Sequence, residues 1–335
     1  MSPRLFSFLL CLALPAAATA QAPAPAARYI DDEKQAEALE KAVLKLAEDS
    51  KATRGKELLG QMNRKSCGIV PAAPSAPVLQ PEEIYTGCSG GVVAINSAWK
   101  ADDGDGWQAG EPATAWVLTP DGVMVTNHHV FLEAEKEEVF GVMLNDGRFF
   151  PVTEILAADS LNDVVIFKVP AKGLQPLALG VNEAVGKKVC VISHPDRQFY
   201  TFTQGQITRY TLQRDEEKAP PVKYMCITAD YARGSSGGPV LNDHGAVVGM
   251  VCSTRTTYYG EKDKDKDDDV QMVVKFCIPA ESIRGLLKAV PVPPPAPNDA
   301  PPKALPVEAI PAPPAVPATA GNVPPKAEPV PEPEQ

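Results

Sequence analysis

Short apolar runs rich in β-branched residues dominate the chain between about residues 84 and 280. About ten such runs follow one another, separated by turn signals such as Pro120-Asp121-Gly122 and Asn145-Asp146-Gly147. Few helical patterns interrupt them, which disfavours a parallel sheet built from strand–helix–strand units. The spacing therefore predicts an all-β fold, either a sandwich or a pair of barrels.

Helical periodicity occurs on both sides of this β-rich region. Residues 31–50 carry Leu39, Ala42, Val43, Leu46 and Ala47 at helical spacing, with charges on the opposite face. The pattern predicts a docking or capping helix, and a pro-segment is the alternative. Residues 281–290 predict a short closing helix.

Proline marks the segments that cannot belong to a packed core, because each proline lacks a backbone donor. Of the 35 prolines, 17 fall in the 45 residues 291–335, which we expect to be disordered. This tail is interpreted as a spacer, or alternatively as a ligand for a proline-binding groove. Residues 68–83 hold four more prolines and predict a linker.

The N-terminus has the composition of a secretory signal. Arg4 precedes a short apolar core, and Ala18-Thr19-Ala20 supplies small residues for cleavage before Gln21. We therefore expect a signal peptide over 1–20 and an exported protein, periplasmic or secreted. An uncleaved anchor is the alternative, and no later run is long enough to span a bilayer.

Net charge limits the partners of the exported chain. The formal charge is −10 at pH 7, and such a field repels nucleic acid and anionic membranes. Export also favours disulfides among the six cysteines that remain after Cys11, while the lack of a CxxC spacing argues against zinc. Fifteen pairings are open; the pairing we expect is 67–88, 190–226 and 252–277.

Three polar blocks within the β-rich region point to nucleophilic catalysis. Gly234-Ser235-Ser236-Gly237-Gly238-Pro239 can present a hydroxyl and backbone N–H groups on a tight turn. Thr126-Asn127-His128-His129-Val130 ends one run, and Asp163 opens another. Because serine needs a base and the base needs an orienting group, histidine, aspartate and serine form a coherent set in a known order.

With these blocks, residues 88–282 resemble the trypsin-like protease domain of the HtrA/Deg type and its bacterial relatives. The matching segments are 121–130, 159–169 and 229–242, followed by 245–251. The resemblance implies a double six-stranded β-barrel with the active site between the barrels. It also implies a serine endopeptidase that acts on protein or peptide substrates through an acyl-enzyme, without cofactor or metal.

Carried over motif by motif, the resemblance gives each residue a role. His129 becomes the general base rather than His128, Asp163 its orienting partner rather than Asp159, and Ser236 the nucleophile rather than Ser235. The backbone N–H groups of Gly234 and Ser236 would form the oxyanion hole.

Asp230 lies six residues before Ser236, the offset that forms the base of the specificity pocket in trypsin-like enzymes. There it would select Arg or Lys before the scissile bond; alternatively it matches an acidic residue found earlier in the HtrA block.

The expected organisation is a signal peptide (1–20), an N-terminal segment (21–83), a protease domain (84–290) and a tail (291–335). No PDZ-like module follows the protease domain, so peptide-activated regulation is in doubt. The acidic and basic run 261–269 lacks the EF-hand spacing and predicts a solvated loop. An inactive protein of the same fold that binds partners, and a zymogen, are the competing interpretations. The oligomeric state stays open.

Overall fold

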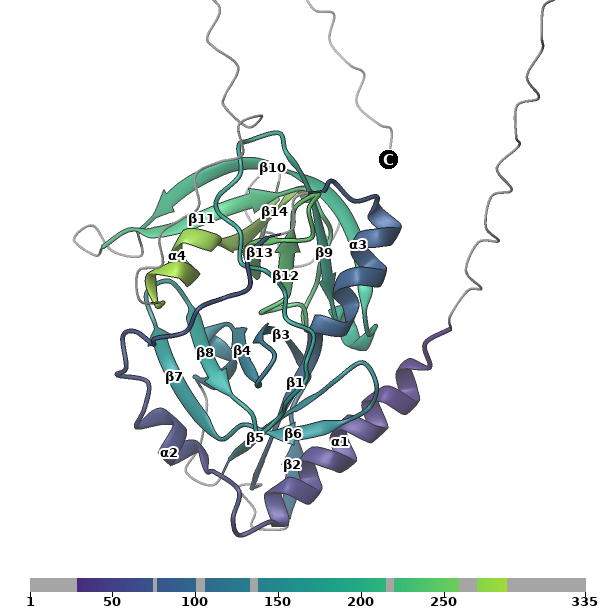
Figure 1. Cartoon of the computed structure of the whole chain (residues 1–335), viewed down its shortest axis with the longest axis vertical. Coiled ribbons are helices and arrows are strands. Elements are labelled where there is room, and N and C mark those ends of the chain that lie inside the picture. Colours follow the sequence, from purple (N-terminus) through teal and green to yellow (C-terminus); the bar gives the residue numbers. More distant parts are fainter. Residues whose placement is uncertain are drawn as a thin grey trace, which may run out of the picture. The chain divides into compact units, whose positions relative to one another are not determined.

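The computed structural model describes residues 29–74, 77–100, 106–132, 138–214, 220–258 and 270–287 (Figure 1). All of them lie in the first of two compact units, Met1–Val290. The predicted signal peptide, the charged run 261–269 and the proline-rich tail fall outside the described residues.

The first half of the β-rich region forms one antiparallel sheet of eight strands. Seven follow the order β6-β5-β1-β3-β4-β8-β7, and β2 pairs with β1. The strands are β1 (Val92–Lys100), β2 (Trp107–Ala109), β3 (Ala113–Thr119), β4 (Val123–Thr126), β5 (Val139–Met143), β6 (Phe149–Pro151), β7 (Glu154–Asp159) and β8 (Val164–Lys168).

The second half closes into a six-stranded antiparallel barrel in the order β10-β11-β14-β13-β12-β9. Its strands are β9 (Lys188–Ser193), β10 (Thr201–Gln213), β11 (Val222–Ile227), β12 (Pro239–Leu241), β13 (Val247–Tyr258) and β14 (Val270–Pro279). The predicted all-β fold is confirmed. The predicted six-stranded barrel is found in the second lobe, whereas the first lobe is a sheet of eight strands rather than six.

Successive side chains of β1 point to opposite faces of the sheet, and this alternation explains how the lobes are held together. Val93 and Ile95 belong to the core inside the first lobe. Val92 and Ala94, which point the other way, belong to a larger core that also includes Ile192 and Met250 of the second lobe. Both faces of β1 are therefore buried, and the lobes share one continuous apolar layer.

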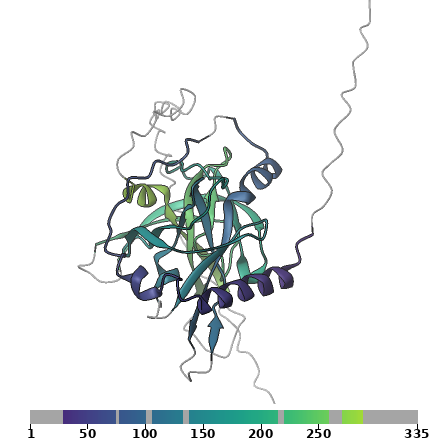
Figure 2. The same cartoon turned by 60° about the horizontal axis from the view of Figure 1, so that its bottom comes forward.

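The helices lie outside the two sheets (Figure 2). α1 (Asp32–Glu48) begins where the Asp31 side chain accepts a hydrogen bond from the N–H of Lys34, and it packs on β1 and β5 through Leu39, Val43 and Ala47. The predicted docking helix is confirmed. The remaining helices are α2 (Gly55–Leu59), α3 (Pro81–Cys88), α4 (Ala280–Gly285) and the 3₁₀ turns η1 (Ser89–Gly91), η2 (His128–Phe131) and η3 (Pro195–Arg197).

α3 begins inside the predicted linker. Pro81 occupies its first turn, where a missing N–H costs nothing, and Glu83 accepts a hydrogen bond from the N–H of Gln80 at 2.7 Å. The prolines of 68–83 thus include a helix start as well as linker positions. α4 confirms the predicted closing helix, and among the described residues no helix has the length and apolarity needed to cross a membrane.

The predicted disulfides are wrong: all six cysteines in the described part of the chain are free thiols. Cys190 lies on β9 and Cys226 on β11, and β10 separates these strands, which puts the two cysteines about two strand spacings apart. Cys277 belongs to the barrel core, whereas the thiol of Cys252 reaches Asp163. Cys67 pairs through its backbone with Leu287 rather than meeting Cys88.

The contribution of α1 to stability can be measured. Leu39 is fully buried under this helix, so Leu39→Ala should lower the free energy of unfolding by about 2–5 kcal/mol. Leu59→Ala, at an exposed position of α2, is the control and should change the free energy of unfolding by less than about 0.5 kcal/mol. Denaturant titration measures both values, and equal effects would contradict a packed α1.

Candidate active site

His129 and Asp163 form a two-point contact. His129 lies in η2, immediately after β4, and Asp163 lies just before β8. The ring Nδ1 of His129 is 2.8 Å from Asp163 Oδ2, and the backbone N–H of His129 donates to Oδ1, also at 2.8 Å. Oδ2 therefore orients the imidazole, whereas Oδ1 holds the backbone of His129. An Nδ1–H that donates to Oδ2 leaves Nε2 unprotonated in the neutral ring.

Asp163 has an unusual backbone, with φ at 54°. Its carbonyl accepts a hydrogen bond from the side-chain amide of Asn127 at 3.1 Å, which ties the β7–β8 turn to the residue before the histidine turn. A positive φ in a residue other than glycine persists only when the surroundings hold it. Asn127 and His129 supply that support.

Cys252 is a member of the site that sequence reasoning missed. Its thiol lies 3.3 Å from Asp163 Oδ2, and its carbonyl accepts a hydrogen bond from Ser236 Oγ at 3.4 Å. Burial, then the charge of Asp163, raise the pKa of the thiol, so it stays protonated and can donate. The assignment of Cys252 to a disulfide hid this role. Its position directly after the family-like segment 245–251 was the available signal.

The turn that carries Ser236 is held by backbone geometry and by the first lobe. Gly234 and Gly237 have φ values of +91° and +85°, which favour glycine. Thr114 of β3 donates from its N–H to Ser236 O at 2.9 Å and from its hydroxyl to Gly234 O at 2.8 Å. Ser235 is buried and accepts from the Ser193 hydroxyl at 3.0 Å.

The peptide before Gly234 is oriented by η3. Asp196 N–H donates to Arg233 O at 2.7 Å. In a trans peptide the C=O and N–H point in opposite directions, so the N–H of Gly234 faces away from Asp196. Within the described residues no acceptor pairs with the N–H of Gly234 or of Ser236, and both remain available to an external oxygen.

The structure thus joins the predicted residues in one series of contacts. The Ser236 hydroxyl contacts the carbonyl of Cys252, and the thiol of Cys252 contacts the Asp163 carboxylate. That carboxylate in turn contacts the ring of His129. Asp159 is elsewhere, since its carboxylate accepts the N–H groups of Leu161 and Asn162 in the β7–β8 turn.

His128 makes no comparable contact in the described region, and its pKa is lowered, chiefly by burial.

Asp230 does not have the environment expected of a buried pocket base. Its side chain is 83% exposed and pairs with Lys275 Nζ at 2.7 Å. The next residue, Tyr231, has its hydroxyl within hydrogen-bond distance of the carbonyls of Ser253 and Phe276, at 2.9 and 2.8 Å. Lys275 therefore already neutralises this carboxylate, and the role of Asp230 as the base of a specificity pocket stays a prediction.

His194 is a structural residue behind the turn. It is fully buried between Phe199 and Tyr200, and its Nδ1 accepts the N–H of Tyr200 at 3.0 Å. Burial lowers the pKa of its imidazole to about 4. The ring is therefore neutral at pH 7 and holds the segment that follows β9.

Comparison with known proteins agrees with this geometry. Residues 113–250, which include His129, Asp163 and Ser236, match the family model of the trypsin-like peptidase domain. Over these residues the chain is similar to trypsin-like peptidase domains. Its curated relatives carry the names of HtrA and DegP proteases.

Three curated relatives show how far the similarity extends. A probable periplasmic serine endoprotease DegP-like of Halomonas elongata is 36% identical over 143 residues, 41% of this chain and 28% of the relative. The mitochondrial serine protease HTRA2 of Drosophila pseudoobscura is 28% identical over 177 residues, which cover 50% of this chain and 40% of the relative. The putative serine protease HhoB of Synechocystis is 29% identical over 151 residues, which cover 44% of this chain and 35% of the relative.

The chain therefore spans less than half the length of these relatives. Among solved structures, a variant of the HtrA-type protease AlgW with decapeptide aligns with a TM-score of 0.48 at 16% identity. That alignment covers 61% of this chain and 64% of the other.

Alanine substitutions at two glycines with nearly the same φ distinguish the cost of backbone strain from the cost of steric crowding. A Cβ at Gly147 (φ +84°) would meet open space, whereas one at Gly237 (φ +85°) would collide with Thr114 O and Thr126 Oγ1. Gly147→Ala should cost about 1–2 kcal/mol of stability, and Gly237→Ala about 1–3 kcal/mol more. Denaturant unfolding measures both, and equal costs would show that the turn is not clamped by β3.

Burial of His194 should make stability depend on pH. Its pKa is about 4 in the folded protein against an ordinary value of 6.5, so between these values the unfolded chain binds more protons. The free energy of unfolding should therefore fall as pH falls from 6.5 to 4, by up to about 1.4 kcal/mol per pH unit from this group.

His194→Asn keeps an acceptor for the N–H of Tyr200 but removes the titration. The difference in unfolding free energy between wild type and variant should therefore shrink toward low pH. Urea titrations at several pH values measure it, and a difference independent of pH would contradict a buried neutral imidazole.

Proposed function

We propose that this protein is an exported serine endopeptidase that hydrolyses peptide bonds through an acyl-enzyme. The observation that supports this most is the two-point contact of His129 with Asp163, joined to Ser236 through Cys252. A trypsin-like peptidase domain matches the same residues, and the named relatives are serine proteases.

In this proposal Ser236 Oγ rotates from Cys252 O toward His129 and attacks the scissile carbonyl carbon. Nε2 of His129 takes the hydroxyl proton, and the imidazolium formed is stabilised by Asp163. The carbonyl oxygen, now negative, accepts hydrogen bonds from the N–H groups of Gly234 and Ser236. His129 then gives its proton to the leaving amine, and the acyl-enzyme forms.

Water completes the cycle. His129 takes a proton from water as its oxygen attacks the acyl carbon, and returns it to Ser236 when the ester bond breaks. Cys252 acts on Asp163 throughout, because its thiol reaches the same oxygen that accepts from His129 Nδ1. Preference for Arg or Lys before the scissile bond stays a prediction of the resemblance and is not part of this proposal, because the Asp230 carboxylate is exposed and already paired with Lys275.

Export belongs to the same proposal. The N-terminal sequence up to Ala20 has the composition of a signal peptide. A relative that carries a periplasmic name, the DegP-like protein of Halomonas elongata, supports this compartment. A mitochondrial relative, the HTRA2 of Drosophila pseudoobscura, is the competing comparison. We also keep the proposed organisation of 21–83, 84–290 and 291–335 around one protease domain.

Ser236→Ala should lower hydrolysis of casein by about 10⁴-fold or more, because it removes the proposed nucleophile. Ser160→Ala, an exposed serine outside the site, is the matched control and should retain wild-type turnover. Mass spectrometry of new peptide ends measures cleavage.

Labelling of Ser236 by a peptidyl phosphonate gives an independent readout. Wild-type and Ser160→Ala protein should be labelled, and Ser236→Ala should not. Cleavage retained in Ser236→Ala would contradict the assignment, whereas folded wild type with neither cleavage nor labelling would favour the inactive binding protein.

A further inference from the structure

The segment 194–200, which joins β9 to β10, contacts the turn that carries the proposed nucleophile. The N–H of Asp196 donates to Arg233 O at 2.7 Å, and a Cβ at Gly234 would collide with His194 O. The Arg233–Gly234 peptide therefore takes its orientation from this segment, because the carbonyl and the N–H of a trans peptide point in opposite directions. The N–H of Gly234 is one of the two donors of the proposed oxyanion hole.

The segment 194–200 has a strained backbone. Asp196, Arg197 and Tyr200 have φ values of 48°, 59° and 59°, and each such residue costs about 1 kcal/mol or more. A strained segment keeps its conformation only while contacts with the surroundings hold it. The contacts that hold residues 194–200 therefore also decide the direction of the Gly234 N–H.

One of these contacts comes from α1. Asp32, the first residue of that helix, accepts the N–H of Phe199 with its carboxylate Oδ1 at 2.8 Å. In the described part of the chain no other acceptor pairs with this N–H, and Phe199 is buried. A buried N–H that loses its partner costs about 1–3 kcal/mol. The Asp32 carboxylate is therefore a strong constraint on the segment.

The position of Asp32 suits this contact. Negative charge is stabilised in the first turn of a helix, and α1 is anchored on β1 and β5 by Leu39, Val43 and Ala47. A helix that is fixed to the first lobe therefore presents this carboxylate to a segment of the second lobe.

Arg197 supplies a second link between the segment and acidic side chains. Its guanidinium donates to both carboxylate oxygens of Glu111, at 2.9 and 2.8 Å. These hydrogen bonds raise the pKa of Arg197, and the negative charge of Glu40 on α1 acts in the same direction. Both Arg197 and Glu111 are about half exposed, so solvent screens their ion pair. The buried N–H of Phe199 is therefore the stronger constraint.

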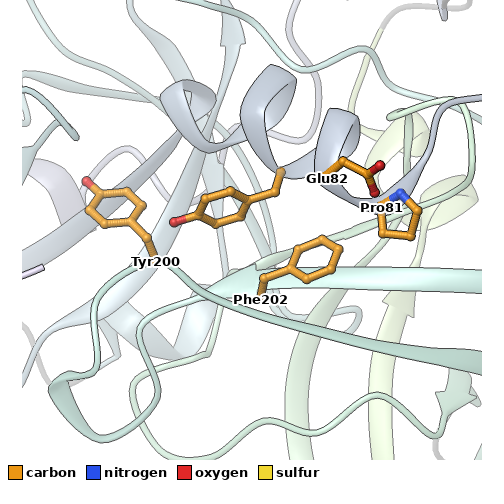
Figure 3. A pocket seen from close by; sticks show the side chains of 5 residues that line it. Pro81, Glu82, Tyr200 and Phe202 are labelled. Carbon is orange, nitrogen blue, oxygen red and sulfur yellow. The ribbon is translucent and has the colours of Figure 1, made fainter. Parts of the chain in front are cut away.

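Open space borders the end of the segment. Tyr200 lines an aromatic pocket of about 520 Å³ between α3 and the start of β10, together with Pro81, Glu82, Tyr85 and Phe202. Figure 3 shows Tyr200 at one end of this pocket and Pro81 and Glu82 toward the other. Tyr200 also lines a second pocket, of about 340 Å³, at the start of α1. This space allows the segment to relax once a hydrogen bond that holds it is removed.

We propose that α1, through Asp32, positions residues 194–200 and thereby the Gly234 N–H of the oxyanion hole. Helix α1 lies outside residues 113–250, which match the family model, so this role belongs to the N-terminal segment of the chain. Asp32 is a positioning residue, since it acts through the segment 194–200. The inference rests on the proposed serine endopeptidase function, and it makes α1 an activating part of the enzyme rather than an inhibitory pro-segment.

Steady-state kinetics of the full chain test the positioning role. The substrate is a fluorogenic peptide taken from a site in casein that the wild type cleaves. Asp32→Ala should lower kcat by about tenfold and leave KM within about twofold, because complete loss of an oxyanion-hole donor costs roughly 10²–10³-fold in kcat. Asp32→Asn keeps an acceptor for the N–H of Phe199 and should recover kcat to within about twofold of wild type.

Glu33→Ala is the matched control. Glu33 is also a first-turn carboxylate of α1, but it is exposed and makes no hydrogen bond to residues 194–200 in the described structure. The control should retain the kcat of wild type. Equal losses in Asp32→Ala and Glu33→Ala, or no loss in Asp32→Ala, would overturn the proposal.

A transition-state analogue separates the oxyanion hole from a general loss of structure. In a trifluoromethyl ketone of the same peptide, Ser236 Oγ bonds to the carbonyl carbon, its proton passes to His129, and the carbonyl oxygen becomes an oxyanion. The affinity for this ketone should fall in Asp32→Ala by the same factor as kcat. An unchanged affinity for the ketone would contradict an effect on the oxyanion hole.

Amide hydrogen exchange distinguishes failure of this inference from failure of the proposed function, because it needs no turnover. The N–H of Phe199 should exchange about tenfold faster in Asp32→Ala than in wild type or Glu33→Ala. With this exchange pattern, a wild type that neither cleaves casein nor reacts with the phosphonate would overturn the proposed function and still support the contact of Asp32 with the segment. An active wild type with unchanged exchange in Asp32→Ala would overturn the positioning role.

Discussion

The buried residue Thr114 connects the two lobes at the turn that carries Ser236. Its N–H and hydroxyl donate to Ser236 O and Gly234 O, its hydroxyl accepts from His194 N, and its carbonyl accepts from Thr126 Oγ1. Every polar group of a fully buried side chain and backbone is thereby paired. The geometry of the turn depends on this residue, because the second lobe alone supplies no equivalent contacts to these carbonyls in the described structure.

The same network reaches the aromatic pocket. His194 donates through its backbone to Thr114 and accepts through its ring from the N–H of Tyr200, and Tyr200 lines the pocket between α3 and β10. Residues 194–200 include Asp196, Arg197 and Tyr200 at positive φ. This strained segment lies between the nucleophile turn and the pocket, and its neutral buried imidazole supports both.

Sequence reasoning succeeded where one local pattern decides the outcome. Alternation and turn residues predicted the strands, and the spacing of Leu39 and Val43 predicted α1. The family resemblance predicted which histidine and aspartate meet. It failed where the outcome depends on distant neighbours. The pairing of Cys190 with Cys226 requires neighbouring strands, but barrel closure places β10 between them. The sequence also does not show that Lys275 pairs with Asp230.

The sequence by itself therefore determined the fold class, the docking helix and the set of polar residues that form the candidate site. Periodicity and turn chemistry act over a few residues, and a sequence displays them directly. Only the tertiary structure decided that Cys252 faces Asp163, that Thr114 clamps the nucleophile turn and that α3 and β10 enclose an aromatic pocket. These contacts join residues that are far apart in sequence, and the closure of the barrel and the packing of the lobes set their geometry.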